Sequence, residues 1–132
     1  MPHLSIEYSP HLGERADMAQ LMESLHSVLL RIDTFPNAGI RVRGHKADHA
    51  IVADGHPDND FVAMTLSVGA GRSTAELKAA GDELFDAARA VLRGPLSSPY
   101  FALSLEIRVI DPELSWKETP IHARLSGQAR GT

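Results

Sequence analysis

The sequence predicts a single α+β domain made of a duplicated β-α-β unit, with a four-stranded mixed sheet and two helices on one face. Three observations predict it: four segments alternate apolar and polar residues, two segments repeat apolar residues at helical spacing, and the order strand–helix–strand occurs twice. The second unit follows the first at an offset of about 60 residues, the sign of an internal duplication. At 132 residues the chain fits one domain, divided here into residues 2–46, 61–110 and a tail, 111–132.

The first unit begins with a strand over residues 3–8, where apolar side chains at positions 4, 6 and 8 alternate with polar ones. A helix follows, introduced by a capping box formed by Asp17 and Gln20. Its apolar stripe consists of Met18, Leu21, Met22, Leu25, Val28, Leu29 and Ile32. The segment GIRVRGH then predicts a second strand, with Arg41 and Arg43 on its polar face.

The second unit repeats this order after a polar, turn-rich loop in which residues 50–53 could form a short strand. FVAMTLSVG predicts a third strand, and Ser73 and Glu76 have capping-box spacing at the start of a second helix. GPLSSP is expected to stop that helix, and alternation over 103–109 predicts the fourth strand. The tail from Asp111 reads as irregular, with a hairpin or hook around WKETPIH and disordered last residues.

Each helical crossover should make its two flanking strands parallel, because such connections are right-handed and return to the same sheet. Both helices then cover one face of the sheet and leave the other face open. A two-layer domain of this size needs cover for that face, and self-association is the simplest cover.

Composition excludes several classes of protein. The net charge is −4, which argues against nucleic-acid binding, and the chain has no cysteine for disulfides, thiolate metal sites or thiol catalysis. No apolar run approaches the roughly 20 residues of a membrane-spanning helix, and no signal peptide is evident. The expected location is the cytoplasm, without membrane or nucleic-acid partners.

Pro2 is the first candidate for chemistry. Removal of Met1 would leave a secondary amine at a defined place in the first strand. An α-amino group titrates near about 8, and burial or neighbouring cations lower that pKa, so such an amine can act as a base at neutral pH. The alternative is that Pro2 is an ordinary N-terminal residue.

Three arginines are candidates for binding anions. Arg41 and Arg43 lie on one strand face, where they either bind carboxylates through their planar guanidinium groups or are simply solvated. Arg72 stands in GAGRS, between a strand end and a helix start, where backbone N–H groups also favour anions. The glycines there do not form a phosphate-binding loop, because the Walker lysine and the full GxGxxG pattern are absent. Arg15 and Arg89 lie outside these motifs and are expected to be neutral controls.

A group of histidines and aspartates offers a metal site as the rival interpretation. Its members are His45, Asp48, His49, Asp54, His56 and Asp58. Because that stretch reads as a polar loop rather than a helix, the side chains are not positioned in advance as ligands. We therefore expect no metal.

These residues together resemble a known family. MPHLSIEYS, FPNAGIRVRGH, ADG, FVAMTLSVGAGRS and LSLEI resemble the 5-carboxymethyl-2-hydroxymuconate Δ-isomerase family of the tautomerase superfamily, in the right order over nearly all of residues 2–122. The resemblance implies a tautomerase-like fold, a homotrimer, and catalysis without metal or organic cofactor. It also implies that Pro2 is the catalytic base, Arg41 a second catalytic residue, and Arg72 and Arg43 substrate-binding residues.

The activity implied is the isomerisation of 5-carboxymethyl-2-hydroxymuconate, a small polycarboxylate, to its 2-oxo-3-ene isomer in homoprotocatechuate (4-hydroxyphenylacetate) degradation. Alternatives are a tautomerase-fold enzyme for another 2-hydroxydienoate or related substrate, and a non-catalytic binding module on this fold. His122 matches the family pattern, whereas Thr119 and Pro120 depart from it. Since proline lacks an N–H, Pro120 is expected to disturb the pairing of the tail.

Overall fold

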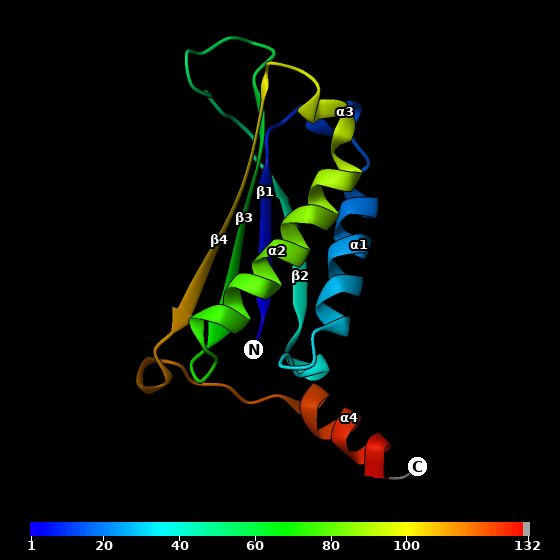
Figure 1. The fold of residues 1–132 in the computed structure, drawn as a ribbon, viewed down its shortest axis with the longest axis vertical. Coiled ribbons are helices and arrows are strands. Elements are labelled where there is room, and N and C mark those ends of the chain that lie inside the picture. The colour runs from blue at the N-terminus through cyan, green and yellow to red at the C-terminus, as the bar shows by residue number, and fades with distance from the viewer. Residues whose placement is uncertain (131–132) are drawn as a thin grey trace.

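The computed structural model describes residues 1–130, and its sheet has the predicted mixed topology. The strand order is β2-β1-β3-β4, with bounds β1 His3–Tyr8, β2 Arg41–Lys46, β3 Asp60–Gly69 and β4 Phe101–Ile110. β1 pairs with β2 in parallel and β3 with β4 in parallel, whereas β1 and β3 are antiparallel. Figure 1 shows α1 (Met18–Arg31) and α2 (Thr74–Val91) on one face of this sheet, as expected from the two crossovers.

Both long helices begin where their capping residues predict. The Asp17 carboxylate accepts a hydrogen bond of 2.9 Å from the Gln20 amide at the start of α1. At the start of α2 the Ser73 hydroxyl accepts from the Glu76 amide, and the Glu76 carboxylate accepts from the Ser73 amide, each at 3.1 Å. These bonds satisfy amide groups that have no partner inside the helix.

The core lies between the sheet and the two helices. The inward side chains of β1 and β3 are buried against the apolar stripes of α1 and α2, as the two periodicities predict. The core's members include Leu4, Ile6, Leu21, Leu25, Leu29, Val62, Met64, Leu66, Val68, Ala80, Leu84 and Ala88. Burial of this apolar surface is the main favourable contribution to folding.

The other face of the sheet carries small and polar side chains. One row across the strands is Arg41, His3, Ser67 and Arg108, and the next is Arg43, Ser5, Thr65 and Glu106. Within residues 1–130 no further layer covers this face (Figure 1). The structure therefore has the uncovered sheet face that the sequence predicted.

Three local predictions are wrong. Residues 50–53 form an irregular segment that ends in a turn rather than a strand. The chain also continues past α2 into one further helical turn, α3 (Arg93–Leu96). The tail contains a helix, α4 (Pro120–Arg130), in place of the expected irregular hairpin. Of the last residues, expected to be disordered, 131 and 132 lie outside the described part of the chain.

Pro120 explains why the tail is helical. It is the first residue of α4, where a missing N–H removes no intrahelical bond and the fixed φ favours the helix. The preceding Thr119 carbonyl accepts the Ala123 amide at 3.3 Å, so the helix has a hydrogen-bonded first turn. The proline thus starts a helix and does not disturb a strand pairing.

Three short 3₁₀ turns complete the fold: η1 (Leu12–Glu14), η2 (Asn37–Gly39) and η3 (Pro112–Leu114). In the described residues, every helix is too short or too polar to span a bilayer.

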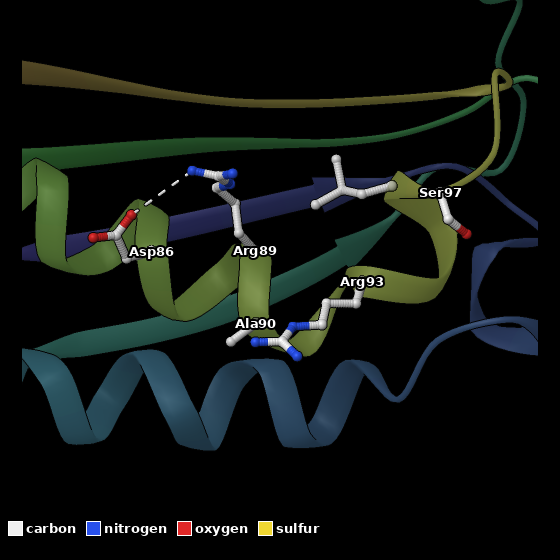
Figure 2. A pocket seen from close by; sticks show the side chains of 6 residues that line it. Asp86, Arg89, Ala90, Arg93 and Ser97 are labelled. Atoms are coloured by element: carbon white, nitrogen blue, oxygen red, sulfur yellow. Dashed lines mark ion pairs between the residues drawn. The ribbon is translucent and has the colours of Figure 1, made fainter.

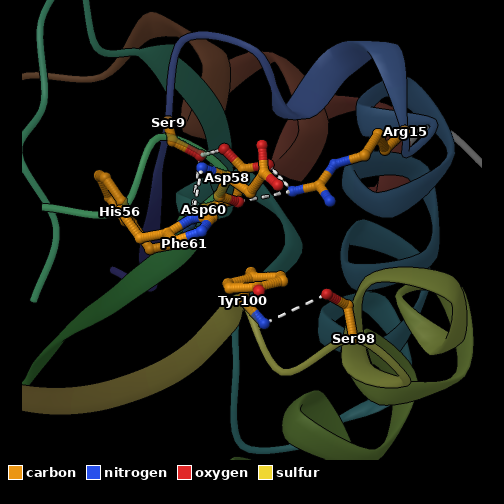
Figure 3. Close-up of polar contacts among 8 residues, drawn as sticks. All are labelled: Ser9, Arg15, His56, Asp58, Asp60, Phe61, Ser98 and Tyr100. Atoms are coloured by element: carbon orange, nitrogen blue, oxygen red, sulfur yellow. Dashed lines mark hydrogen bonds and ion pairs between the residues drawn. The ribbon is translucent and has the colours of Figure 1, made fainter. Parts of the chain in front are cut away.

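A polar cluster of Ser9, Arg15 and Asp60 connects three segments of the chain at the end of the sheet away from the N-terminus (Figure 3). Asp60 is only 7% exposed, and its Oδ1 accepts a 2.6 Å hydrogen bond from the Ser9 hydroxyl. The Arg15 guanidinium pairs with Asp60 Oδ2 and donates to the Asp58 carbonyl at 3.3 Å. Arg15 therefore has a structural role and is unsuited as a neutral control, whereas Arg89 forms only an exposed pair with Asp86 at 4.0 Å.

Replacing Arg15 by alanine should lower the free energy of unfolding by about 1–3 kcal/mol, because the buried Asp60 carboxylate loses its charged donor. Urea denaturation monitored by circular dichroism measures this. The matched control, Arg89→Ala, removes an exposed pair and should change stability by no more than about 0.5 kcal/mol. Equal stability of the two variants would contradict the role of the Ser9–Asp60–Arg15 cluster.

Candidate active site

The site is built around the N-terminus, which pairing between β1 and β2 brings to one edge of the sheet. The Arg41 amide donates a 3.0 Å hydrogen bond to the Pro2 carbonyl, so the first two residues lie against η2. Gly39 permits this approach, since a Cβ there would lie 3.1 Å from Met1 Cα and 3.5 Å from Pro2 Cδ. Pro2 itself is buried.

A cavity of about 380 Å³ lies beside this N-terminus. α4 packs against η2 below the sheet in Figure 1, and the cavity lies between these elements and the chain start. Its lining residues are Met1, Pro36, Ala38, Gly39, Lys117, Thr119, His122 and Ala123. Residues from both ends of the chain therefore form one cavity.

The electrostatics of this edge favour a neutral amine. Burial is the largest cause that lowers the pKa of the Met1 amine below its ordinary 8.0, followed by the charges of Arg72, Lys117 and Arg41. Both causes act in the same direction, because desolvation and neighbouring cations disfavour an ammonium group. An amine in this place therefore stays neutral, and able to accept a proton, down to a lower pH than an amine in water does.

Arg72 is held in position by backbone carbonyls. Its Nε and Nη2 donate to the Thr34 carbonyl at 3.1 and 2.7 Å, and its Nη1 donates to the Gly69 carbonyl at 3.2 Å. The guanidinium also lies over the Phe35 ring, 4.9 Å from its centroid. A guanidinium has five N–H groups, so these contacts with described residues leave two for a ligand.

Arg41 and Arg43 are separated by this geometry. Arg41 Nη1 donates to the Gly39 carbonyl at 3.1 Å, which keeps its half-buried side chain beside the N-terminus. Arg43 lies one row further along the open face, paired with Ser5, and is exposed. Neither arginine lines the cavity itself.

His3 lies opposite Arg41 on the open face, one row away from Arg43. Burial, then the charges of Arg41, Arg43 and the N-terminus, lower the pKa of His3. Its Nε2 is buried and has no hydrogen-bond partner among the described residues. Burial and the two nearby arginines therefore disfavour the charged form of His3 on the open face.

The structure brings three of the four predicted site residues, Pro2, Arg41 and Arg72, to one edge. It also adds Lys117, which the sequence interpretation did not assign. No local pattern shows that a lysine in the tail returns to the N-terminus, and the only available signal was its place in WKETPIH beside the family-matching His122.

The histidines of the rival interpretation are dispersed. His45 is an exposed residue of β2, and the His56 ring stacks on Tyr100 with centroids 4.4 Å apart (Figure 3). His56 Nδ1 also accepts a hydrogen bond from the Asp58 amide at 3.1 Å. Among residues 1–130 no three histidine, aspartate or glutamate side chains are grouped to hold a metal ion.

A second hollow, of about 450 Å³, lies along α2 and α3 and contains Arg89, Arg93 and Ser97 (Figure 2). In Figure 2 the Arg89 side chain points towards Asp86 and the Arg93 side chain extends the other way. The two guanidinium groups do not converge on a common point. This hollow therefore lacks the arrangement found at the N-terminus.

Comparison with solved structures defines the fold first. A structure described as a fused 4-OT wild-type symmetric trimer matches with a TM-score of 0.63 at 16% identity, covering 88% of this chain and 93% of that chain. At that identity the likeness shows the fold alone, which is the tautomerase fold.

Sequence similarity then defines the family. The family model for 5-carboxymethyl-2-hydroxymuconate isomerase matches residues 2–125. A 5-carboxymethyl-2-hydroxymuconate Delta-isomerase of Escherichia coli is 38% identical over 123 residues, 93% of this chain and 98% of that protein. A crystal structure of a 5-carboxymethyl-2-hydroxymuconate isomerase from Deinococcus radiodurans R1 matches with a TM-score of 0.87 and 36% identity, covering 94% of this chain and 93% of that one. The chain belongs to the 5-carboxymethyl-2-hydroxymuconate isomerase family.

Proposed function

We propose that this protein isomerises 5-carboxymethyl-2-hydroxymuconate to its 2-oxo-3-ene isomer, in the degradation of homoprotocatechuate, with Pro2 as the general base. The observation that carries the proposal is the N-terminus itself: partly buried, beside a cavity, with three cations that lower the pKa of an amine there. Membership of the isomerase family supports the reaction class.

The proton transfer needs no redox partner. The Pro2 nitrogen, free once Met1 is removed, takes the proton of the 2-hydroxyl group as the C2=O bond forms. The C2=C3 electron pair moves to C3=C4, and the C4=C5 pair takes a proton at C5 from the same nitrogen. One base returns the proton it removed, so the reaction proceeds without metal or organic cofactor.

The arginines supply the charge that the substrate requires. An acidic protein that binds a tricarboxylate needs a local group of cations, and Arg41 and Arg72 lie at the same edge as Pro2. We assign Arg41 to the 2-oxygen, where negative charge develops, and Arg72 to a carboxylate. Arg43, on the open face, contributes to the positive potential on the approach to the site.

The open sheet face supports a homotrimer. Its central residues, Ser5 and Thr65, are small, polar and only partly exposed in one chain, so another copy can pack closely there. The described fold offers no further layer of its own for this face. A second and third copy would cover it.

Purified active protein should begin at Pro2. With Met1 attached, the Pro2 nitrogen is an amide without a basic lone pair, so protein that retains Met1 should be about 10²- to 10⁴-fold less active, the usual range for loss of a general base. Intact mass spectrometry of processed and methionine-retaining preparations, with kcat/KM for each, measures this.

The pH profile supplies the internal control. Because the neutral amine is the active form, kcat/KM should fall as pH drops through the pKa of the Pro2 amine. Burial and the neighbouring cations, which lower the pKa of the Met1 amine, act in the same direction at this end of the chain. Full activity in protein that retains Met1 would exclude Pro2 as the base.

Replacing Arg41 or Arg72 by alanine should lower kcat/KM about 10- to 150-fold each, because each change removes a charge-assisted hydrogen bond to substrate. Arg41→Ala should act mainly on kcat and Arg72→Ala mainly on KM. Lysine should restore little, since it lacks the planar fork. Steady-state kinetics with Arg89→Ala as control tests this, and wild-type activity in both variants would remove the anion-binding site from the proposal.

Arg72→Ala needs a second measurement. Its bonds to the Thr34 and Gly69 carbonyls are structural, so the free energy of unfolding should also fall by about 1–3 kcal/mol. Kinetics at a temperature where the variant is fully folded separate the two effects.

Light scattering should give the mass of three chains at micromolar concentration. Thr65→Arg, which places a long charged side chain at the centre of the open face, should shift the protein to smaller species. Lys78→Arg, an exposed change on α2, is the control and should leave the mass unchanged. A stable wild-type monomer would contradict the trimer.

A further inference from the structure

Lys117 lines the cavity beside the N-terminus although it lies in the tail, three residues before α4 begins. It is the one lysine or arginine among the described residues that line this cavity. The salt bridges found within residues 1–130 do not include Lys117. An ammonium group without a carboxylate partner at the cavity is available for an anionic ligand.

The position of Lys117 near the chain start indicates which ligand group it would meet. Lys117 and Met1 line the same cavity, and the Lys117 charge lowers the pKa of the Met1 amine. Met1 directly precedes Pro2, so Lys117 lies at the end of the chain that carries the proposed base. In the proposed reaction this end of the chain delivers a proton to C5 of the substrate. The carboxymethyl group is attached at C5, so in the proposed reaction its carboxylate lies near the Pro2 nitrogen and this end of the chain.

We propose that Lys117 binds the carboxymethyl carboxylate and so selects tricarboxylate over dicarboxylate substrates, an inference that rests on the proposed function. Arg41 and Arg72 account for the charge at the 2-oxygen and one carboxylate, which leaves two carboxylates, the carboxymethyl one among them, without an assigned cation. A lysine suits this role because its ammonium is a compact point charge on a flexible stem and does not require a planar geometry. Discrimination arises because, without the third carboxylate, the lysine gains no partner.

The experiment compares Lys117→Gln with wild type on 5-carboxymethyl-2-hydroxymuconate and on 2-hydroxymuconate, which lacks the carboxymethyl group. We expect kcat/KM to fall about 10- to 100-fold on the tricarboxylate, the effect of one charge-assisted hydrogen bond, and less than about threefold on the dicarboxylate. Lys117→Arg, which keeps the charge, should recover most of the loss. Lys78→Gln, at an exposed lysine of α2, should behave as wild type on both substrates.

A binding measurement separates failure of this inference from failure of the proposed function. Calorimetry with propane-1,2,3-tricarboxylate and with glutarate, which has one carboxylate fewer, reports on Lys117 without turnover. Lys117→Gln should weaken the first about tenfold or more and leave the second nearly unchanged. Equal losses on both members of either pair would overturn the role of Lys117. A wild-type protein that prefers propane-1,2,3-tricarboxylate but does not turn over 5-carboxymethyl-2-hydroxymuconate would instead refute the proposed reaction.

Discussion

The hydrogen bond from the Arg41 amide to the Pro2 carbonyl determines where the site can be. It extends the parallel pairing of β1 and β2 to the first residues of the chain, so the starts of both strands share one edge of the sheet. β3 is antiparallel to β1, so its end at Gly69 reaches that same edge, and Arg72 follows three residues later. Topology alone thus gathers three segments that are far apart in the sequence, and the side chains only refine their positions.

Charge at this edge opposes the charge of the whole molecule. The chain carries a formal net charge of −4, yet Arg41, Arg72 and Lys117 surround the N-terminus. Holding cations together has an electrostatic penalty, which the protein reduces for Arg72 by giving its guanidinium carbonyl acceptors from Thr34 and Gly69. Arg72 is consequently oriented before any anion arrives, and little side-chain entropy remains to be lost on binding.

The strands, the two long helices and the buried face of each could be predicted, because these features depend on local periodicity and capping. The alternation of Leu4 and Ile6 and the Ser73–Glu76 capping box illustrate this. Pro2, Arg41 and Arg72 were singled out by their places at strand ends and by the family resemblance, and the register of β1 with β2 and β3 brings them to one edge. The pairing of Arg15 with Asp60 could not be predicted, since 45 residues separate them and neither belongs to a motif.

The structure of the tail was predicted wrongly for a different reason. Pro120 is compatible with a broken strand and with the first turn of a helix, and only the contact of α4 with η2 distinguishes the two. The return of Lys117 to the N-terminus is equally a tertiary effect. The most informative part of the site for substrate selection was therefore the part with the weakest local signal.

The approach of Met1 to Gly39 has a practical consequence for handling this protein. Any affinity tag or fusion partner placed before Pro2 would make its nitrogen an amide. The added residues would also have to pass Gly39, where space is so tight that a Cβ on that glycine would lie 3.1 Å from Met1 Cα. The polar loop between β2 and β3 is at the opposite pole of the molecule (Figure 1). Labels, immobilisation linkers or inserted reporter domains are better attached in that loop, because exposed loop tips tolerate insertion and the loop is remote from the chain start.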